Sequence, residues 1–130
     1  MTKTKDTIEL EYVINTTPGI LFNRLSTASG LSEWFADDVK VHGNTFIFRW
    51  DVSEQKAQQS MRKENKMVRY TWIDDEEMEG IWFEFNINVD DLTGDVALVI
   101  IDHVDKDEIE DTIELWNRQI EILKRGLGSS

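Results

Sequence analysis

Apolar and polar residues alternate along most of the chain, which predicts a domain built mainly of β-strands. In residues 7–14, Ile8, Leu10, Tyr12 and Ile14 share one side of an extended chain, and polar side chains occupy most of the other. A period of two indicates a strand with one buried face. Similar patterns, bounded by turn residues, predict strands at six further places: 39–41, 45–50, 53–63, 66–72, 80–89 and 96–101.

Two of these expected strands differ from the rest in their polarity. Residues 53–63 are almost entirely polar, which favours an edge or exposed strand. Residues 96–101 are apolar on both faces, which favours a central or doubly covered position in the sheet. The sequence Asp-Asp-Leu-Thr-Gly at 90–94 predicts the hairpin turn that precedes this last strand.

Two short helical segments are expected directly after the first strand. Thr17 is suited to the N-cap of the first helix, and the only proline, Pro18, to its first position. An apolar stripe follows, and the chain then breaks at Ser29-Gly30. We expect a second short helical turn over residues 31–35, which end in Trp34 and Phe35.

The last segment predicts a long amphipathic helix. Asp105 and Glu108 are spaced as a capping box, and Gly126 is a natural C-terminal stop. A helix of about 20 residues spans about 30 Å, enough to cross a small sheet. One apolar stripe recurs along it at steps of four and three, formed by Ile109, Ile113, Trp116, Ile120 and Leu123.

These elements predict a single α+β domain over residues 1–125, followed by a flexible tail at 126–130. In this fold a curved antiparallel sheet of seven strands wraps around the C-terminal helix, and the two short helices follow the first strand. A chain of 130 residues is long enough to bury roughly two thirds of its unfolded surface.

Three stretches resemble the helix-grip fold of the START-like (SRPBCC, birch-pollen-allergen-like) superfamily. They are the segment from Thr16-Thr17-Pro18 to Trp34-Phe35, the strand Met67-Val68-Arg69-Tyr70-Thr71-Trp72, and the last strand ending at His103. Within the superfamily, the chain looks most like the domains named after activators of the ninety-kilodalton heat-shock-protein ATPase. It departs from them at Gly19, where those domains often have an acidic residue.

The resemblance implies three alternative functions. The first is the binding of a small apolar or amphipathic ligand in a cavity between the sheet and the helix, without catalysis. The second is a protein-interaction or co-chaperone-like role through the acidic surface, and the third is a polyketide-cyclase-like enzyme. The residues by which related activators touch their chaperone cannot be placed here, so chaperone activation is not carried over.

Composition narrows the classes of partner. The net charge of −12 opposes binding to nucleic acid and to anionic membranes. From Asp74 to Glu114 the only basic side chain apart from His103 is Lys106, and this acidic region fits either a solvated surface or a docking site for a basic protein. There is no cysteine, no signal-peptide pattern and no apolar run of transmembrane length. We therefore expect a cytoplasmic protein, monomer or homodimer, without membrane insertion.

Aromatic and apolar residues from several elements should converge between the sheet and the helix. Ligand pockets are mostly apolar with a few polar groups, but core packing uses the same residue types. The candidate cavity residues are Trp34, Phe35, Phe46, Phe48, Trp50, Tyr70, Trp72, Phe83, Phe85, His103, Ile113, Trp116 and Ile120.

Polar groups that could act in such a cavity are few. Tyr70, His103, Gln59 and Arg49 are the candidates, although a register error of one residue would turn each to the other face. Neither His103 nor His42 belongs to a recognisable catalytic set, and the acidic clusters do not fit a calcium loop, so we expect no catalytic residue, metal or cofactor.

Two structural features would separate the alternatives. An open cavity of about 300 Å³ or more beneath Trp116 would favour ligand binding. A filled core together with an apolar patch of Val96, Leu98 and Ile100 on the outer face of the sheet would favour a protein partner or a homodimer.

Overall fold

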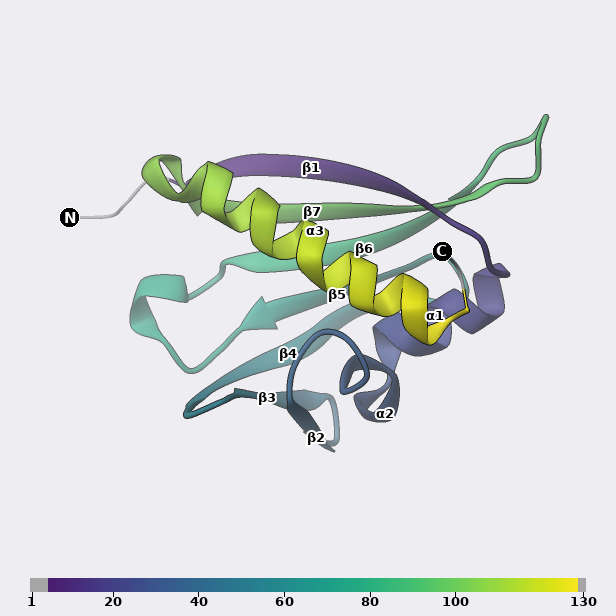
Figure 1. Cartoon of the computed structure of the whole chain (residues 1–130). Coiled ribbons are helices and arrows are strands. Elements are labelled where there is room, and N and C mark those ends of the chain that lie inside the picture. Colours follow the sequence, from purple (N-terminus) through teal and green to yellow (C-terminus); the bar gives the residue numbers. More distant parts are fainter. Residues whose placement is uncertain (1–4, 129–130) are drawn as a thin grey trace.

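The computed structural model describes residues 5–128 and shows one seven-stranded antiparallel sheet with a long helix against it (Figure 1). The strand order is β1-β7-β6-β5-β4-β3-β2. The strands are β1 (Lys5–Ile14), β2 (Asp38–His42), β3 (Thr45–Trp50), β4 (Ser53–Lys63), β5 (Met67–Trp72), β6 (Trp82–Val89) and β7 (Val96–Asp105). The helices are α1 (Pro18–Ser26), α2 (Ala28–Leu31) and α3 (Ile109–Gly126), with 3₁₀ turns at Glu76–Met78 and Lys106–Glu108. This confirms the predicted helix-grip fold.

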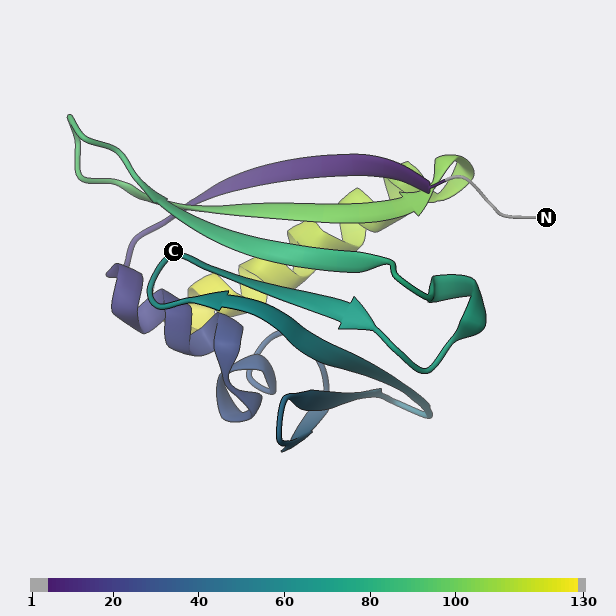
Figure 2. The ribbon, with the colours of Figure 1, turned by 180° about the vertical axis from the view of Figure 1, so that it is seen from behind.

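Helix α3 crosses one face of the sheet, which we call the inner face. Seen from behind, the opposite, outer face carries no helix among the described residues (Figure 2). The buried side of α3 is formed by Trp116, Ile120 and Leu123, spaced by four and three residues. The core therefore lies between the inner face and α3, and α1 also contacts β5 and β6.

Strand β4 is not at the edge of the sheet, so of the two predicted alternatives the edge position is wrong and the exposed strand is confirmed. It pairs with β3 on one side and with β5 on the other, and the edge strands are β1 and β2. Its polar composition has another cause, because its outer face is open to solvent and only Ala57 on its inner side is fully buried. Strand β7 lies inside the sheet between β1 and β6, as its two apolar faces predict.

The residues of β7 that were considered for an apolar patch on the outer face lie on the inner face instead. Val96, Leu98 and Ile100 are at most 6% exposed and belong to the core beneath α3. Strand alternation then places Ala97 and Val99 on the outer face. The proposed apolar patch is therefore part of the core and gives no support to a dimer interface.

The two short helices form with caps at threonines. The Thr17 hydroxyl accepts a hydrogen bond from the Ile20 amide at 3.3 Å, which confirms it as the N-cap of α1. Helix α2 begins earlier than predicted, at Ala28, because the Thr27 hydroxyl caps it by accepting from the Gly30 amide at 2.9 Å. Residues 32–35 form turns beyond its end.

Two polar side chains of the sheet hold the C-terminal end of α1. The Tyr70 hydroxyl donates to the Leu25 carbonyl at 2.6 Å, and the Gln59 amide donates to the Ser26 carbonyl at 3.0 Å. The last carbonyls of a helix have no partner within the helix, so these bonds satisfy groups that burial would otherwise leave unpaired. They close this end of the space between sheet and α3.

The long helix ends where expected, but its start differs from the expectation. No side-chain cap forms at Asp105 or Glu108, and Asp105 instead pairs with Lys5 at 3.1 Å. Helix α3 ends at Gly126 as predicted, but Leu127 still packs against the core. Leu127, which was assigned to the tail, thus contacts the core, and residues 129–130 of the predicted tail lie outside the described part.

Candidate functional site

The space between the sheet and α3 is filled by aromatic rings. Most of the predicted cavity residues are at most 5% exposed and pack against one another as core. This group comprises Trp34, Phe35, Phe46, Phe48, Tyr70, Phe83, Phe85, Trp116 and Ile120.

Phe35 occupies the position where a cavity beneath Trp116 would lie. Its ring centroid is 5.7 Å from that of Trp116 and 5.4 Å from that of Phe83, stacked on both at less than 30°. It also meets Phe48 edge-on at 5.1 Å. Because the ring contacts both the helix and the sheet, it fills the space beneath Trp116, and we call it a plug. The interior is therefore packed where ligand binding would have required an open cavity.

An open cleft remains beside this plug, between the first half of α3 and the ends of β3, β4, β5 and β7. We call it the Trp72 cleft. It has a volume of about 290 Å³, at the lower limit for small-molecule sites. Its walls are mostly apolar, and they are formed by Phe35, Trp50, Ser53, Gln55, Trp72, Asp102, Thr112, Leu115, Trp116 and Gln119.

Of the residues that the structure describes, Asp102 is the only ionisable one in the wall of the Trp72 cleft. Its Oδ2 accepts from the Trp116 indole Nε1 at 3.0 Å, and its Oδ1 accepts from the His103 backbone amide at 2.8 Å. Burial raises the pKa of the Asp102 carboxyl above its ordinary value of 3.8, because it disfavours the charged form. The two hydrogen bonds and the nearby His103 and Lys5 oppose this rise in pKa.

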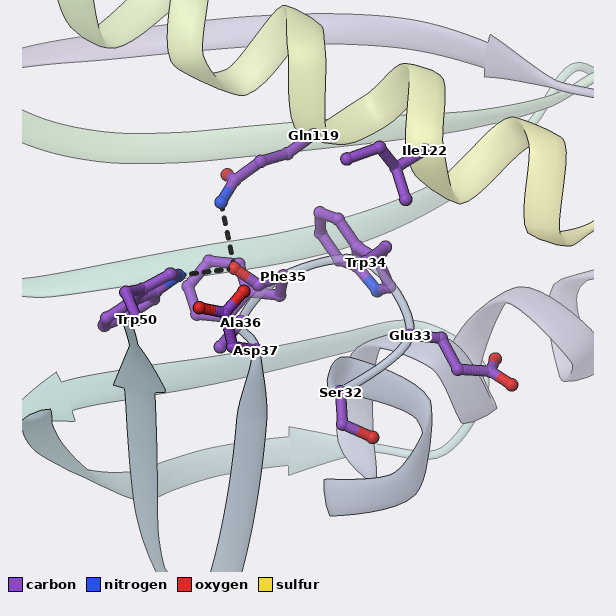
Figure 3. Close-up of a pocket in the computed structure, with 9 residues that line it drawn as sticks. All are labelled: Ser32, Glu33, Trp34, Phe35, Ala36, Asp37, Trp50, Gln119 and Ile122. Carbon is purple, nitrogen blue, oxygen red and sulfur yellow. Dashed lines mark hydrogen bonds between the residues drawn. The ribbon is translucent and has the colours of Figure 1, made fainter. Parts of the chain in front are cut away.

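The Phe35 carbonyl separates the Trp72 cleft from a second one. It accepts from the Trp50 indole at 2.7 Å and from the Gln119 amide at 2.9 Å, as Figure 3 shows. The second cleft, of about 370 Å³, lies on the other side of this junction and is more polar. It is lined by Ser32, Glu33, Trp34, Phe35, Ala36, Asp37, Trp50, Gln119 and Ile122.

The remaining predicted site residues lie at three different places. Trp50 and Trp72 line the Trp72 cleft, with Trp50 only partly buried. Ile113 is half-buried on α3 and does not line the cleft. Gln59 points inward but is engaged at the end of α1 and with the Tyr70 hydroxyl at 3.2 Å.

His103 lies on the outer face, so its expected place in the cavity is wrong. Its Nδ1 hydrogen-bonds with the Thr7 hydroxyl at 3.0 Å, and its ring packs 4.4 Å from that of Trp82. Strand alternation is the reason, because Asp102 points inward and its neighbour must then point outward. Arg49 is outward for the same reason, since Phe48 before it is buried.

Outer-face residues around His103 form a polar network. The Arg69 guanidinium lies 3.8 Å from the Trp82 ring centroid and donates to the Glu84 carboxylate at 2.8 Å. Asn86 donates to the same carboxylate at 2.8 Å. These contacts compensate the cost of burying the Glu84 carboxylate, which is only 6% exposed, and give the network a structural role.

Six of the residues that line the cleft were missed by sequence reasoning: Ser53, Gln55, Asp102, Thr112, Leu115 and Gln119. One of them had a signal in the sequence. Val96, Leu98, Ile100 and Asp102 are spaced by two, so an inward-facing Val96 implies an inward-facing Asp102. The others come from elements whose faces only the packed structure defines.

The acidic loop formed by residues 74–77 lies next to the Trp72 cleft. A surface depression next to the cleft shares Ser53 and Gln55 with it. Its other lining residues are all acidic, namely Glu54, Asp74, Asp75, Glu76 and Glu77.

Within residues 5–128, no group of acidic and histidine side chains is placed to hold a metal ion. None of the described helices is long and apolar enough to cross a bilayer.

Solved structures with the same fold include proteins from several bacteria. BfR322 from Bacteroides fragilis is 34% identical to the chain, with a TM-score of 0.67, over 95% of this chain and 92% of that one. The Aha1 dimer from Colwellia psychrerythraea is 19% identical, with a TM-score of 0.78, over 92% of this chain and 93% of that one.

A more distant neighbour is DynU16, a protein of the dynemicin biosynthetic locus. It is 10% identical, with a TM-score of 0.78, over 95% of this chain and 47% of that one. At such identities, this structure and the Aha1 dimer are evidence for the fold alone. None of the curated proteins compared with the chain matches it. The family model described as START-like superfamily domain matches residues 1–129. The chain therefore belongs to the START-like superfamily.

Proposed function

We propose that the chain binds a small apolar or amphipathic molecule in the Trp72 cleft and does not convert it chemically. The observation that carries this proposal is the lining of the cleft. Indole rings and Leu115 form most of it, and a few polar groups interrupt them, which is the usual composition of a small-molecule site.

The exposure of Leu115 supports a ligand at this place. Leu115 is 49% exposed on α3 although it borders the cleft, and Trp50 beside it is only partly buried. A ligand seated there would cover this apolar surface, at about 25 cal/mol for each square ångström removed from water. The packed interior beneath Trp116 leaves the cleft, and not a deep cavity, as the place for binding.

The positions of the two histidines support binding without catalysis. His103 lies on the outer face beside Trp82, and His42 is exposed on β2. Neither lines the Trp72 cleft. Asp102 is the one ionisable group there within residues 5–128, and a general acid or base would need a second group to orient substrate or accept a proton.

Native mass spectrometry of freshly purified protein tests the proposal. We expect a bound small molecule on the wild-type protein and its loss in Thr112→Phe, because the added ring would fill the cleft. Gln58→Phe is the control, since it adds the same ring at an exposed position on β4 that does not line the cleft. A mass without ligand, together with no thermal shift across a panel of lipids and metabolites, would contradict the proposal.

A further inference from the structure

The Trp72 cleft combines aromatic walls with a single carboxyl group that is partly buried. Trp50, Trp72 and Trp116 all line it, and Asp102 stands in the same wall. The Phe35 ring, which also lines the cleft, meets Trp50 edge-on at 72° and is stacked on Trp116 at 27°. A cleft lined by indole rings and a carboxylate is of the type that holds organic cations, because the faces of the rings carry negative potential.

Asp102 has no ionic partner within the described residues. Its carboxylate oxygens accept from an indole and from a backbone amide, and none of the ion pairs found in residues 5–128 includes it. Among the described residues, no Lys or Arg side chain lines the cleft. Lys5 and His103 favour the charged form of this carboxylate without forming an ion pair with it, and a cation bound in the cleft would supply a direct counter-charge.

The surface around the opening of the cleft also favours a positively charged ligand. The depression that adjoins the cleft at Ser53 and Gln55 is lined otherwise by five acidic side chains from β4 and the 74–77 loop. The whole chain carries a net charge of −12. Such a field raises the local concentration of cations and lowers that of anions such as fatty acids.

We propose that the Trp72 cleft takes the substituted-ammonium head of an amphipathic organic cation, with Asp102 as its counter-charge and three indole rings as its walls. This inference rests on the proposed function and adds the chemical class of the ligand. The apolar part of the molecule lies along Leu115, whose side chain is half-exposed at the edge of the cleft.

Three probes, each built on a straight chain of six carbons, test this choice of ligand: hexyltrimethylammonium, hexan-1-ol and hexanoate. Isothermal titration at constant ionic strength measures their affinities for the wild-type protein. We expect the cation to bind about tenfold or more tightly than the alcohol, and hexanoate to bind most weakly. Equal affinities for the cation and the alcohol, or no saturable binding of the cation, would overturn the inference.

Variants identify the groups responsible. In Asp102→Asn the preference for the cation over the alcohol should fall about tenfold, while Asn still offers an oxygen to Trp116. Asp91→Asn removes the same charge from the exposed hairpin between β6 and β7, and it should leave the preference unchanged. A preference that Asp91→Asn lowers as much as Asp102→Asn would show a general charge effect and overturn the inference.

Trp72→Leu keeps the test decisive if Asp102→Asn does not fold. Leucine retains an apolar wall but removes the ring, so affinity for the cation should fall several-fold more than affinity for the alcohol. Equal losses would overturn the inference. Failure of the proposed function itself is distinguishable, because it is measured by the ligand that co-purifies with wild type and by its response to Thr112→Phe.

Discussion

The indole nitrogen of Trp116 donates a 3.0 Å hydrogen bond to the carboxylate of Asp102, which joins the middle of α3 to the end of β7. Trp116 is only 5% exposed, so its N–H needs a partner within the protein. Asp102 supplies that partner and also forms part of the wall of the Trp72 cleft. The same contact therefore serves the packing of the helix and the chemistry of the proposed site.

Asp102 should make the protein less stable as the pH rises above the acid range. Burial raises its pKa from the ordinary 3.8, so the folded state holds this proton more tightly than the unfolded chain does. Its contribution to the free energy of unfolding is therefore fully present below 3.8 and is lost as the pH rises through the raised pKa.

In Asp102→Asn this loss is absent, because the amide does not titrate. The difference in free energy of unfolding, variant minus wild type, should therefore become more positive as the pH rises from about 4 to about 7. Urea unfolding at a series of pH values measures the difference. His103 and Lys5 lower the same pKa and are present in both proteins, so they do not change the sign. A difference that is constant or of opposite slope would contradict the prediction.

Phe35→Ala should lower the free energy of unfolding by about 3–5 kcal/mol. The ring packs between Trp116 and Phe83, and its removal leaves a cavity that the surrounding rings cannot fill without moving. Chemical denaturation measures the loss. Phe35→Leu, which keeps part of the volume, should lose less, and equal losses for the two variants would show that the ring is not a plug.

Tyr70→Phe should cost about 1–3 kcal/mol, because it leaves the buried Leu25 carbonyl without its donor. Tyr12→Phe is the matched control. It removes a hydroxyl that donates to Asn117 Oδ1 at 2.6 Å in an exposed setting, where water can replace the lost bond. A larger effect of Tyr12→Phe would contradict the prediction.

The Tyr70 phenol adds a dependence on alkaline pH. Burial raises the pKa of Tyr70 well above its ordinary value of 10.0. The folded state then keeps a proton that the unfolded chain releases, so stability should fall as the pH rises beyond 10.0. Tyr70→Phe should weaken this fall in comparative unfolding experiments. An unchanged slope in the variant would show that another group causes it.

Gly30→Ala should destabilise the protein by at least about 2 kcal/mol. A Cβ at this position would lie 2.2 Å from the Asn23 carbonyl oxygen and 2.7 Å from the Arg24 Cα, both of them backbone atoms of α1. Gly126→Ala, at the end of α3 with nothing within 4 Å, should be neutral or stabilising by up to about 1 kcal/mol. Thermal unfolding of the two variants checks the contrast, and equal melting temperatures would contradict it.

Alternation and helical periodicity carry enough information to predict the fold of this chain. The inward set of β1 and the stripe of α3 follow from spacing alone, because strand and helix geometry fix which residues share a face. Spacing does not determine pairing, which is why the polar β4 resembled an edge strand. Its partners β3 and β5 depend on hairpin geometry and not on its own polarity.

The candidate site was less predictable, because it depends on contacts between distant residues. Whether the interior is open is decided by where Phe35 lies, and its carbonyl is held by Trp50 and by Gln119, which is 84 residues away along the chain. No local pattern encodes this junction. His103 was placed wrongly because it was expected on the inner face, which fits an outward Val96, whereas the inward Val96 of the structure places Asp102 inward and His103 outward.

Indole N–H signals in a ¹H–¹⁵N correlation spectrum test the proposed site most directly, because the five tryptophans report from different places. Titration with hexyltrimethylammonium should shift the signals of Trp50, Trp72 and Trp116, which line the Trp72 cleft. The signal of Trp82, which lies beside His103 on the outer face, should stay in place. Shifts confined to Trp82, or no saturable shift of any of the three cleft signals, would contradict binding in this cleft.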